Sequence, residues 1–131
     1  MQGSRLPTLF AERAPATQLA LALIVPAAFG ALVGVVLGVS ATAYWGLQAF
    51  AAVGGVLAGF EHRTPSDAAD RGLFGGLVFG TFLLLAHAIS GAEPKAHLGQ
   101  WPGALILFAG IAGCLLGALG GSGRAALERR R

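Results

Sequence analysis

Two polar side chains, Gln48 and His87, lie inside long apolar runs and are the first candidates for chemistry. Each is seven residues, close to two helical turns, from a glycine of its own run, Gly55 for Gln48 and Gly80 for His87. Counted at 1.5 Å per residue from the run ends at residues 60 and 72, the two side chains lie at depths of about 18 Å and about 22 Å. The spacing therefore predicts a polar intramembrane site formed by Gln48 and His87.

Two interpretations of this pair stay open at the level of sequence. An ionisable residue inside a membrane often serves function, and His87 can accept a proton or bind a ligand. Alternatively, the pair forms an interhelical hydrogen bond of about 0.6 kcal/mol. The apolar runs contain no acidic residue and no lysine, and the chain shows no phosphate-binding loop, haem-binding histidine pair or nucleophile triad. We therefore expect no catalytic residues, no cofactor and no enzymatic activity.

The turn of residues 61–71 holds the densest charge in the chain. Four of its side chains can ligate a divalent cation, namely Glu61, His62, Asp67 and Asp70. Their spacing matches no metal-binding motif, and the alternative is a solvated turn paired with Arg63 and Arg71. Thr64 and Pro65 are a good N-cap and first helical residue, so a helix should begin at Pro65. We predict no metal site here.

Composition identifies the elements that must position these side chains. Of the 131 residues, 55% are hydrophobic and 11% are charged, whereas soluble domains contain about 25% charged residues. A membrane-spanning helix needs about 20 apolar residues. We therefore predict an all-α, four-helix transmembrane bundle that forms a single integral membrane domain over residues 1–131. Its expected spans are about 17–39, 43–60, 72–90 and 103–121, and Pro26 should kink the first.

Small residues recur at four-residue spacing in all four spans, the pattern of glycine-zipper packing, in which backbones approach closely. The glycines expected to pack helices are Gly30, Gly34, Gly38, Gly55, Gly59, Gly72, Gly76, Gly80, Gly113 and Gly117. The stripes of spans two to four lie mainly in the half nearer the termini. These spans should converge there and splay at the other end, leaving a shallow cavity near Gln48 and His87. The stripes repeat at offsets of 42 and 58 residues, which indicates either two tandem helical hairpins or a shared composition.

Charge placement predicts the orientation. Lys95 lies on one side of the predicted membrane, and eight arginines lie on the other: Arg5, Arg13, Arg63, Arg71, Arg124, Arg129, Arg130 and Arg131. Basic residues favour the cytoplasmic side, so both termini should be cytoplasmic. Because these residues mark membrane ends, we expect no nucleic-acid partner. The preference for arginine, alanine and glycine suggests a bacterial cytoplasmic membrane.

The function expected from these features is structural. Four spans can use only some of the glycines internally, so the chain should be an accessory subunit or a homo-oligomeric membrane component. Its partners would be the lipid bilayer and either further copies or a larger membrane protein. The alternative is a small channel or transporter for a neutral or weakly polar solute.

Overall fold

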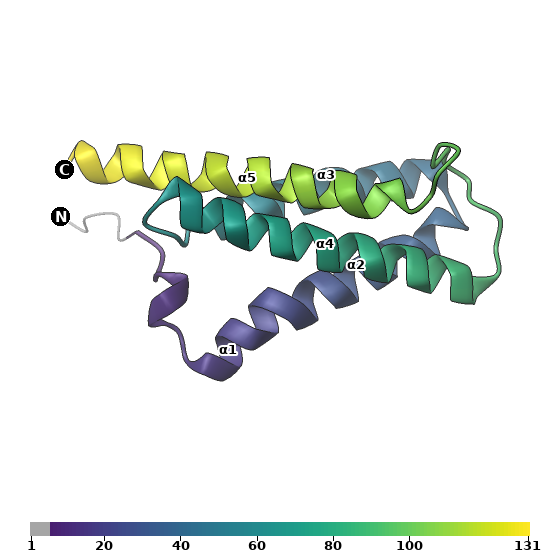
Figure 1. Cartoon of the computed structure of the whole chain (residues 1–131), viewed down its shortest axis with the longest axis horizontal. Helices are drawn as coiled ribbons and strands as arrows, with labels where there is room; N and C mark the ends of the chain where they lie inside the picture. Colours follow the sequence, from purple (N-terminus) through teal and green to yellow (C-terminus); the bar gives the residue numbers. More distant parts are fainter. Residues whose placement is uncertain (1–5) are drawn as a thin grey trace.

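The computed structural model describes residues 6–131, and every regular element in that part of the chain is helical (Figure 1). Four of its helical stretches are long and apolar enough to cross a membrane. This confirms the prediction of an all-helical chain with four candidate spans, and these helices have the length and composition expected of a multi-pass membrane protein. A short 3-10 turn, η1 (Phe10–Glu12), precedes them. The first span comprises α1 (Pro15–Leu19), a π-helical turn η2 (Ala20–Ile24) and α2 (Val25–Leu37); the others are α3 (Ala41–Gly59), α4 (Pro65–Ser90) and α5 (Ala104–Arg129).

Local sequence sets the helix ends. The hydroxyl of Thr64 accepts a hydrogen bond from the Asp67 amide at 3.1 Å, so α4 begins with the predicted cap. Ser40 caps α3 in the same way, at 3.2 Å from the Ala43 amide. The helix α4 ends at Gly91, whose φ of 64° lies in the left-handed region that glycine adopts without strain. The last helix continues beyond residue 121 to Arg129.

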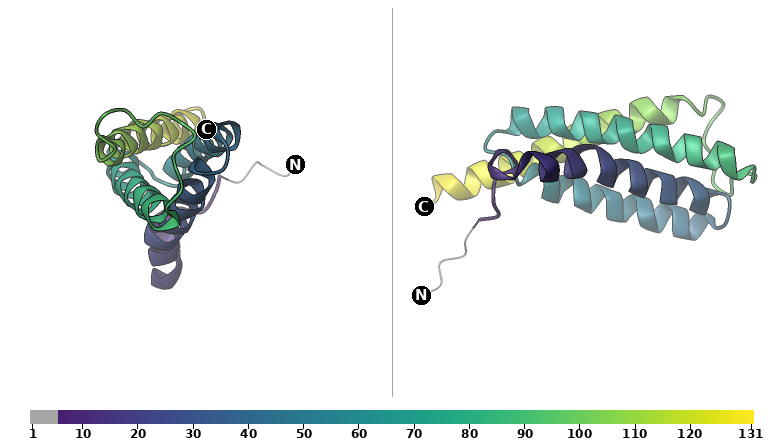
Figure 2. Two further views of the ribbon diagram at one scale, coloured as in Figure 1. Left: turned by 90° about the vertical axis from the view of Figure 1, so that its right-hand side faces the viewer. Right: turned by 90° about the horizontal axis from the view of Figure 1, so that it is seen from below.

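The four spans pack in the order first span, α4, α5, α3. The helices α4 and α5 form the most extensive pair, α2 packs mainly on α4, and α3 packs mainly on α5. Few contacts join the first span to α3, so the seam between these two is the open side of the bundle. Figure 2 shows the bundle along its axis and from the side. We call the end with η1, the C-terminus and the α3–α4 turn the terminal end, and the opposite end the loop end (Figure 1).

Glycines make the close helix contacts. A Cβ added at Gly72 would collide with the carbonyl oxygen of Gly113, and one at Gly76 with that of Ala109, so α4 and α5 touch through their backbones. The predicted packing glycines divide among three helix pairs. Contacts with α4 come from Gly30 and Gly34 of the first span; contacts between α3 and α5 come from Gly55, Gly59 and Gly117; contacts between α4 and α5 come from Gly72, Gly76, Gly80, Gly113 and Gly117. Gly38 instead meets Ala92 of the α4–α5 loop.

The hydrophobic core lies at the loop end. Its buried members are Val33, Leu37, Tyr44, Leu83 and Ala96. The α4–α5 loop closes over them, and the Lys95 amide donates to the Leu37 carbonyl at 2.8 Å. The predicted position of a cavity beside both Gln48 and His87 is therefore wrong, because the cavity of this bundle lies nearer the terminal end and includes Gln48 but not His87 among its lining residues. The glycines of the first span lie in its loop-end half and hold it against α4 there, while α1 diverges from the bundle at the terminal end (Figure 1).

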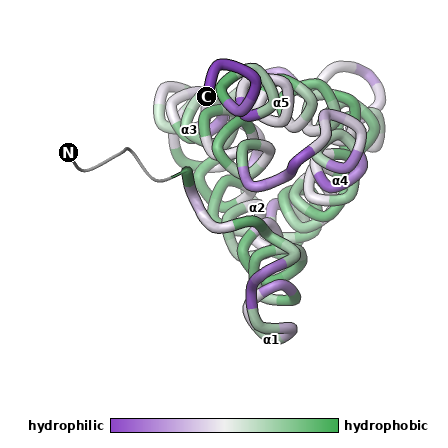
Figure 3. Tube along the Cα trace, turned by 90° about the vertical axis from the view of Figure 1, so that its left-hand side faces the viewer, coloured by the Kyte–Doolittle hydropathy of each residue, from purple (hydrophilic) through white to green (hydrophobic). Residues whose placement is uncertain are grey.

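Arginines organise the terminal end, where polar residues gather (Figure 3). Arg124 of α5 is only 6% exposed. It donates to the Pro7 carbonyl at 2.8 Å and the Phe60 carbonyl at 3.1 Å, and it pairs with Glu128 at 2.9 Å. Arg124 therefore ties the N-terminal segment to the α3–α4 turn and to α5. Arg5, one of the arginines used to predict orientation, lies outside the described residues.

Candidate functional site

The polar pair predicted from sequence, Gln48 and His87, bonds to other partners. The amide of Gln48 donates to the Tyr44 hydroxyl at 2.9 Å, one turn earlier in α3. The Nδ1 atom of His87 lies 3.3 Å from the Gly34 carbonyl oxygen, to which it donates when it carries the proton. Gly34 makes this possible because, without a side chain, it lets α4 approach. The expected hydrogen bond between Gln48 and His87 is thus replaced by one bond within α3 and one between α2 and α4.

The charged turn uses its side chains for folding contacts. Glu61 pairs with Arg13 at 2.6 Å, and the His62 ring stacks on Phe10 with 5.4 Å between ring centroids. Glu12 lies 3.9 Å from Arg63 in an exposed pair. Within residues 6–131, no three histidine, cysteine, aspartate or glutamate side chains gather closely enough to hold a metal ion.

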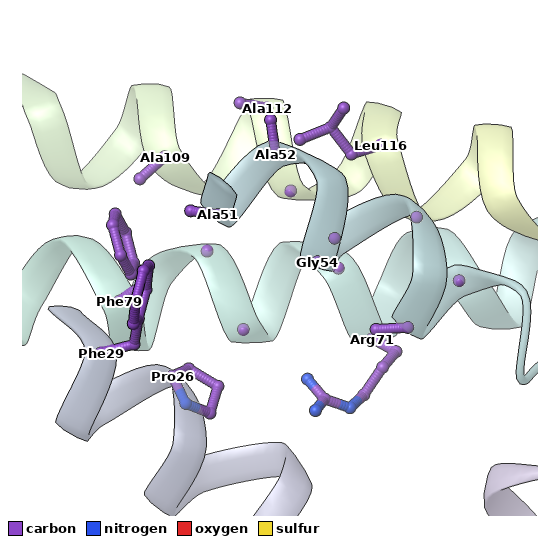
Figure 4. A pocket seen from close by; sticks show the side chains of 18 of the residues that line it. Pro26, Phe29, Ala51, Ala52, Gly54, Arg71, Phe79, Ala109, Ala112 and Leu116 are labelled. Carbon is purple, nitrogen blue, oxygen red and sulfur yellow. The ribbon is translucent and has the colours of Figure 1, made fainter. Parts of the chain in front are cut away.

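A cavity of about 380 Å³ lies inside the bundle, and its lining includes residues of the first span and of α3, two elements that make few contacts with each other. All four spans line it (Figure 4). Leu21, Pro26 and Phe29 come from the first span, and α3 contributes residues from Gln48 to Gly59. The helices α4 and α5 contribute Phe79 and Leu116 together with their glycine contact faces. Binding pockets for small molecules commonly measure about 300–1,000 Å³, so this cavity has the size of a binding site.

Among residues 6–131, the polar side chains that line the cavity are those of Gln48 and Arg71. The guanidinium of Arg71 reaches from α4 toward the first span (Figure 4). Its Nη2 donates to the carbonyl oxygen of Leu21, and its carbon lies 5.4 Å above the ring of Phe10, a cation–π distance. Its Nε is buried and has no hydrogen-bond partner.

The carbonyl that Arg71 binds is made available by the π turn and the proline together. In an α-helix, the Leu21 carbonyl would accept from the Val25 amide, but in η2 that amide donates to Ala20 instead. The next amide that a π-helix could offer is that of residue 26, which is a proline and has none. An unpaired carbonyl in an apolar setting is costly, and the Arg71 guanidinium satisfies it. The predicted disturbance of the first helix at Pro26 thus creates the acceptor that holds Arg71.

The charge of Arg71 has no carboxylate bonded to it. Among residues 6–131, Arg13, Arg63 and Arg124 each have a carboxylate within 4.0 Å, whereas Arg71 forms no such pair. Glu61 acts on Arg71 electrostatically, but its carboxylate is bonded to Arg13. The cavity therefore presents one cation beside a wall of carbon.

Sequence reasoning treated Arg71 as an orientation marker and as a partner for the charged turn, and so missed its place in the cavity. A signal was present in Gly75. This glycine lies outside the four-residue stripe of α4 and follows Arg71 by one turn. A Cβ at Gly75 would lie 2.9 Å from the Nη1 of Arg71, so glycine leaves room for the guanidinium to fold along its own helix.

Comparison of this chain with known protein families, with curated proteins and with solved structures gives no match. The chemistry of the cavity is therefore the only guide to its use. A guanidinium stays protonated and acts as a hydrogen-bond donor and fixed positive charge rather than as a proton acceptor. An apolar wall with one such cation can bind and orient an amphiphilic molecule.

Proposed function

We propose that this protein is a small polytopic membrane component that works by association, as an accessory subunit or as a homo-oligomer. The observation that supports this best is the incomplete closure of the bundle. Three of its four sides are closed by extensive helix packing, whereas the first span and α3 make few contacts with each other and both line the cavity. The polar groups of that cavity, an amide and a guanidinium, are suited to holding a partner in place.

Glycine-zipper packing is the proposed basis of the stability of each copy. Glycines of three helix pairs lie where any side chain would collide with a neighbouring backbone, at Gly34, Gly59 and Gly72 for example. Gly46 and Gly54 of α3 are different, because an added Cβ at either would meet no atom within 4 Å. A glycine inside a helix costs about 1 kcal/mol relative to alanine. Gly54 lines the cavity, whereas Gly46 does not, so Gly46 is the position that favours a contact outside the single copy.

The proposed location is a bacterial cytoplasmic membrane, with the terminal end facing the cytoplasm. Arg13, Arg63 and Arg124 lie at that end, and Lys95 lies in the loop at the other end. This asymmetry supports the positive-inside orientation.

The test is native mass spectrometry of the protein released gently from its own membrane. A defined homo-oligomer or a stable complex with a larger membrane protein is the expected result. A leucine at Gly46 should weaken that assembly while leaving the single copy folded, because it meets no internal neighbour. A monomer in every gentle detergent, with no partner recovered, would refute the proposal.

A second candidate is a small transporter or channel for a neutral or weakly polar solute. The observation that favours it is the asymmetry of the bundle, which is sealed by buried side chains at the loop end and hollow toward the terminal end. A one-sided cavity is the shape that alternating access requires. This candidate predicts solute flux into liposomes that contain the purified protein alone, and the absence of flux across a panel of small neutral solutes would exclude it.

A further inference from the structure

The cavity and Arg71 together match one class of ligand. Arg71 directly precedes the predicted span 72–90, which places its guanidinium at the depth of lipid headgroups. From Arg71, the cavity runs along α4 to Phe79, a distance of about 12 Å at 1.5 Å per residue. Apart from Gln48, the side chains that line this path are apolar, and Phe29 and Phe79 stack at its far end with 6.1 Å between ring centroids. A molecule that fits has an anionic end and an apolar tail.

The positive charge of Arg71 indicates that the anionic end of the ligand binds at this residue. The guanidinium uses one bond on the Leu21 carbonyl and leaves its buried Nε without a partner. Guanidinium groups bind phosphate through charge-assisted hydrogen bonds, and no carboxylate of the described residues is bonded to this one. Because the first span and α3 are the least packed pair of neighbouring spans, we expect the ligand to enter between them from the bilayer.

We propose that the cavity is a binding site for an anionic phospholipid, with the phosphate on Arg71 and one acyl chain along Pro26, Phe29 and Leu116. This inference goes beyond the proposed accessory role, which concerns protein partners. The lipid fills the seam that the helices leave open. A soluble anion would satisfy the guanidinium and leave the carbon-lined part of the cavity unused, so the site is assigned to a lipid.

The experiment compares lipid binding to the purified full chain by native mass spectrometry, with phosphatidylglycerol and phosphatidylcholine of identical acyl chains. Both lipids carry a phosphate, but phosphatidylcholine also carries a trimethylammonium group whose positive charge is repelled by Arg71. The wild type should therefore bind phosphatidylglycerol about tenfold more tightly. Arg71→Gln should abolish the preference, and Arg71→Lys should keep most of it.

A pair of α3 variants tests the acyl chain separately from the charge. Gly54→Leu places a side chain at the cavity wall, where an added Cβ would meet no atom within 4 Å, and should reduce phosphatidylglycerol binding severalfold. Gly46→Leu is the matched control, because Gly46 is equally free of neighbours but does not line the cavity, and it should bind like the wild type. This pair of variants tests whether the lipid occupies the cavity even if the Arg71 variants fail to fold.

Three results would overturn the assignment. These are equal binding of the two lipids by the wild type, unchanged binding by Gly54→Leu, and displacement of phosphatidylglycerol by millimolar inorganic phosphate. The last would show that the site recognises an anion without its acyl chain. The same spectra report protein assembly through much larger mass differences, so loss of the lipid preference and loss of the proposed complex are read separately.

Discussion

Replacing Gly72 by alanine tests the contact on which this fold depends most. An added Cβ at this position would collide with the carbonyl oxygen of Gly113, so α4 and α5 would have to move apart. Backbone atoms cannot rotate away as a side chain can. The helices α4 and α5 form the most extensive pair of the bundle, so a shift there is transmitted along both.

The magnitude follows from two opposing terms. Alanine favours the helix over glycine by about 1 kcal/mol. Overpacking a well-filled contact costs about 1–3 kcal/mol, and a clash with backbone belongs at the upper end of that range. Gly72→Ala should therefore lower the free energy of unfolding by about 1–2 kcal/mol.

A graded series of alanine variants separates the two terms. Gly46→Ala meets no atom within 4 Å and should stabilise α3 by its helix propensity alone. Gly110→Ala would lie 2.7 Å from the Cδ2 of Leu77, a flexible side chain that can turn aside, and should be intermediate. The assay is reversible unfolding in mixed micelles, followed by circular dichroism. If Gly72→Ala proves as stable as Gly46→Ala, the close approach of α4 and α5 is refuted.

Three further substitutions address other contacts. Arg124→Met should lower the free energy of unfolding by about 1–3 kcal/mol and expose the N-terminal segment to protease, because two backbone carbonyls lose their donor. The control Glu128→Gln keeps an acceptor oxygen and should be nearly neutral. Equal effects of the two substitutions would contradict the role of Arg124 as the donor to these carbonyls. Pro26→Ala restores a backbone amide, so η2 should become α-helical and its amides should exchange more slowly with deuterium. Unchanged exchange would show that proline is not the cause of the π turn. Tyr44→Phe removes the acceptor of Gln48 and should cost about 0.6 kcal/mol in thermal unfolding, and a loss of several kcal/mol would point to a further role of the hydroxyl.

Much of the architecture could be predicted from local sequence. Thr64 and Pro65 define the start of α4 by capping rules that act within one helical turn. Hydropathy over about 20 residues identifies each span, because the bilayer selects for length and apolarity alone. The missing amide of Pro26 is a property of the residue itself and predicts a disturbed helix, but the sequence did not predict that the disturbance would take the form of a π turn at residues 20–24.

The candidate site could not be predicted in the same way. The depth argument brought Gln48 and His87 together, but depth does not specify which helix faces which. Packing order placed α4 beside α2, where His87 meets Gly34, and left Gln48 on α3 bonded to Tyr44. The positive-inside rule uses only the side of the membrane on which Arg71 lies and gives no information about the direction of its side chain.

The sequence by itself determined that this protein has four apolar helices, with a capped start of α4 and small residues in register, because each of these properties depends on a few neighbouring residues or on composition. Tertiary structure decided which helices pair, which seam stays open and where the cavity lies. Those outcomes depend on backbones that meet from distant parts of the chain, as Gly72 meets Gly113. They also depend on the hydrogen bond from Arg71 to the carbonyl of Leu21, which the π turn and Pro26 leave without a backbone donor.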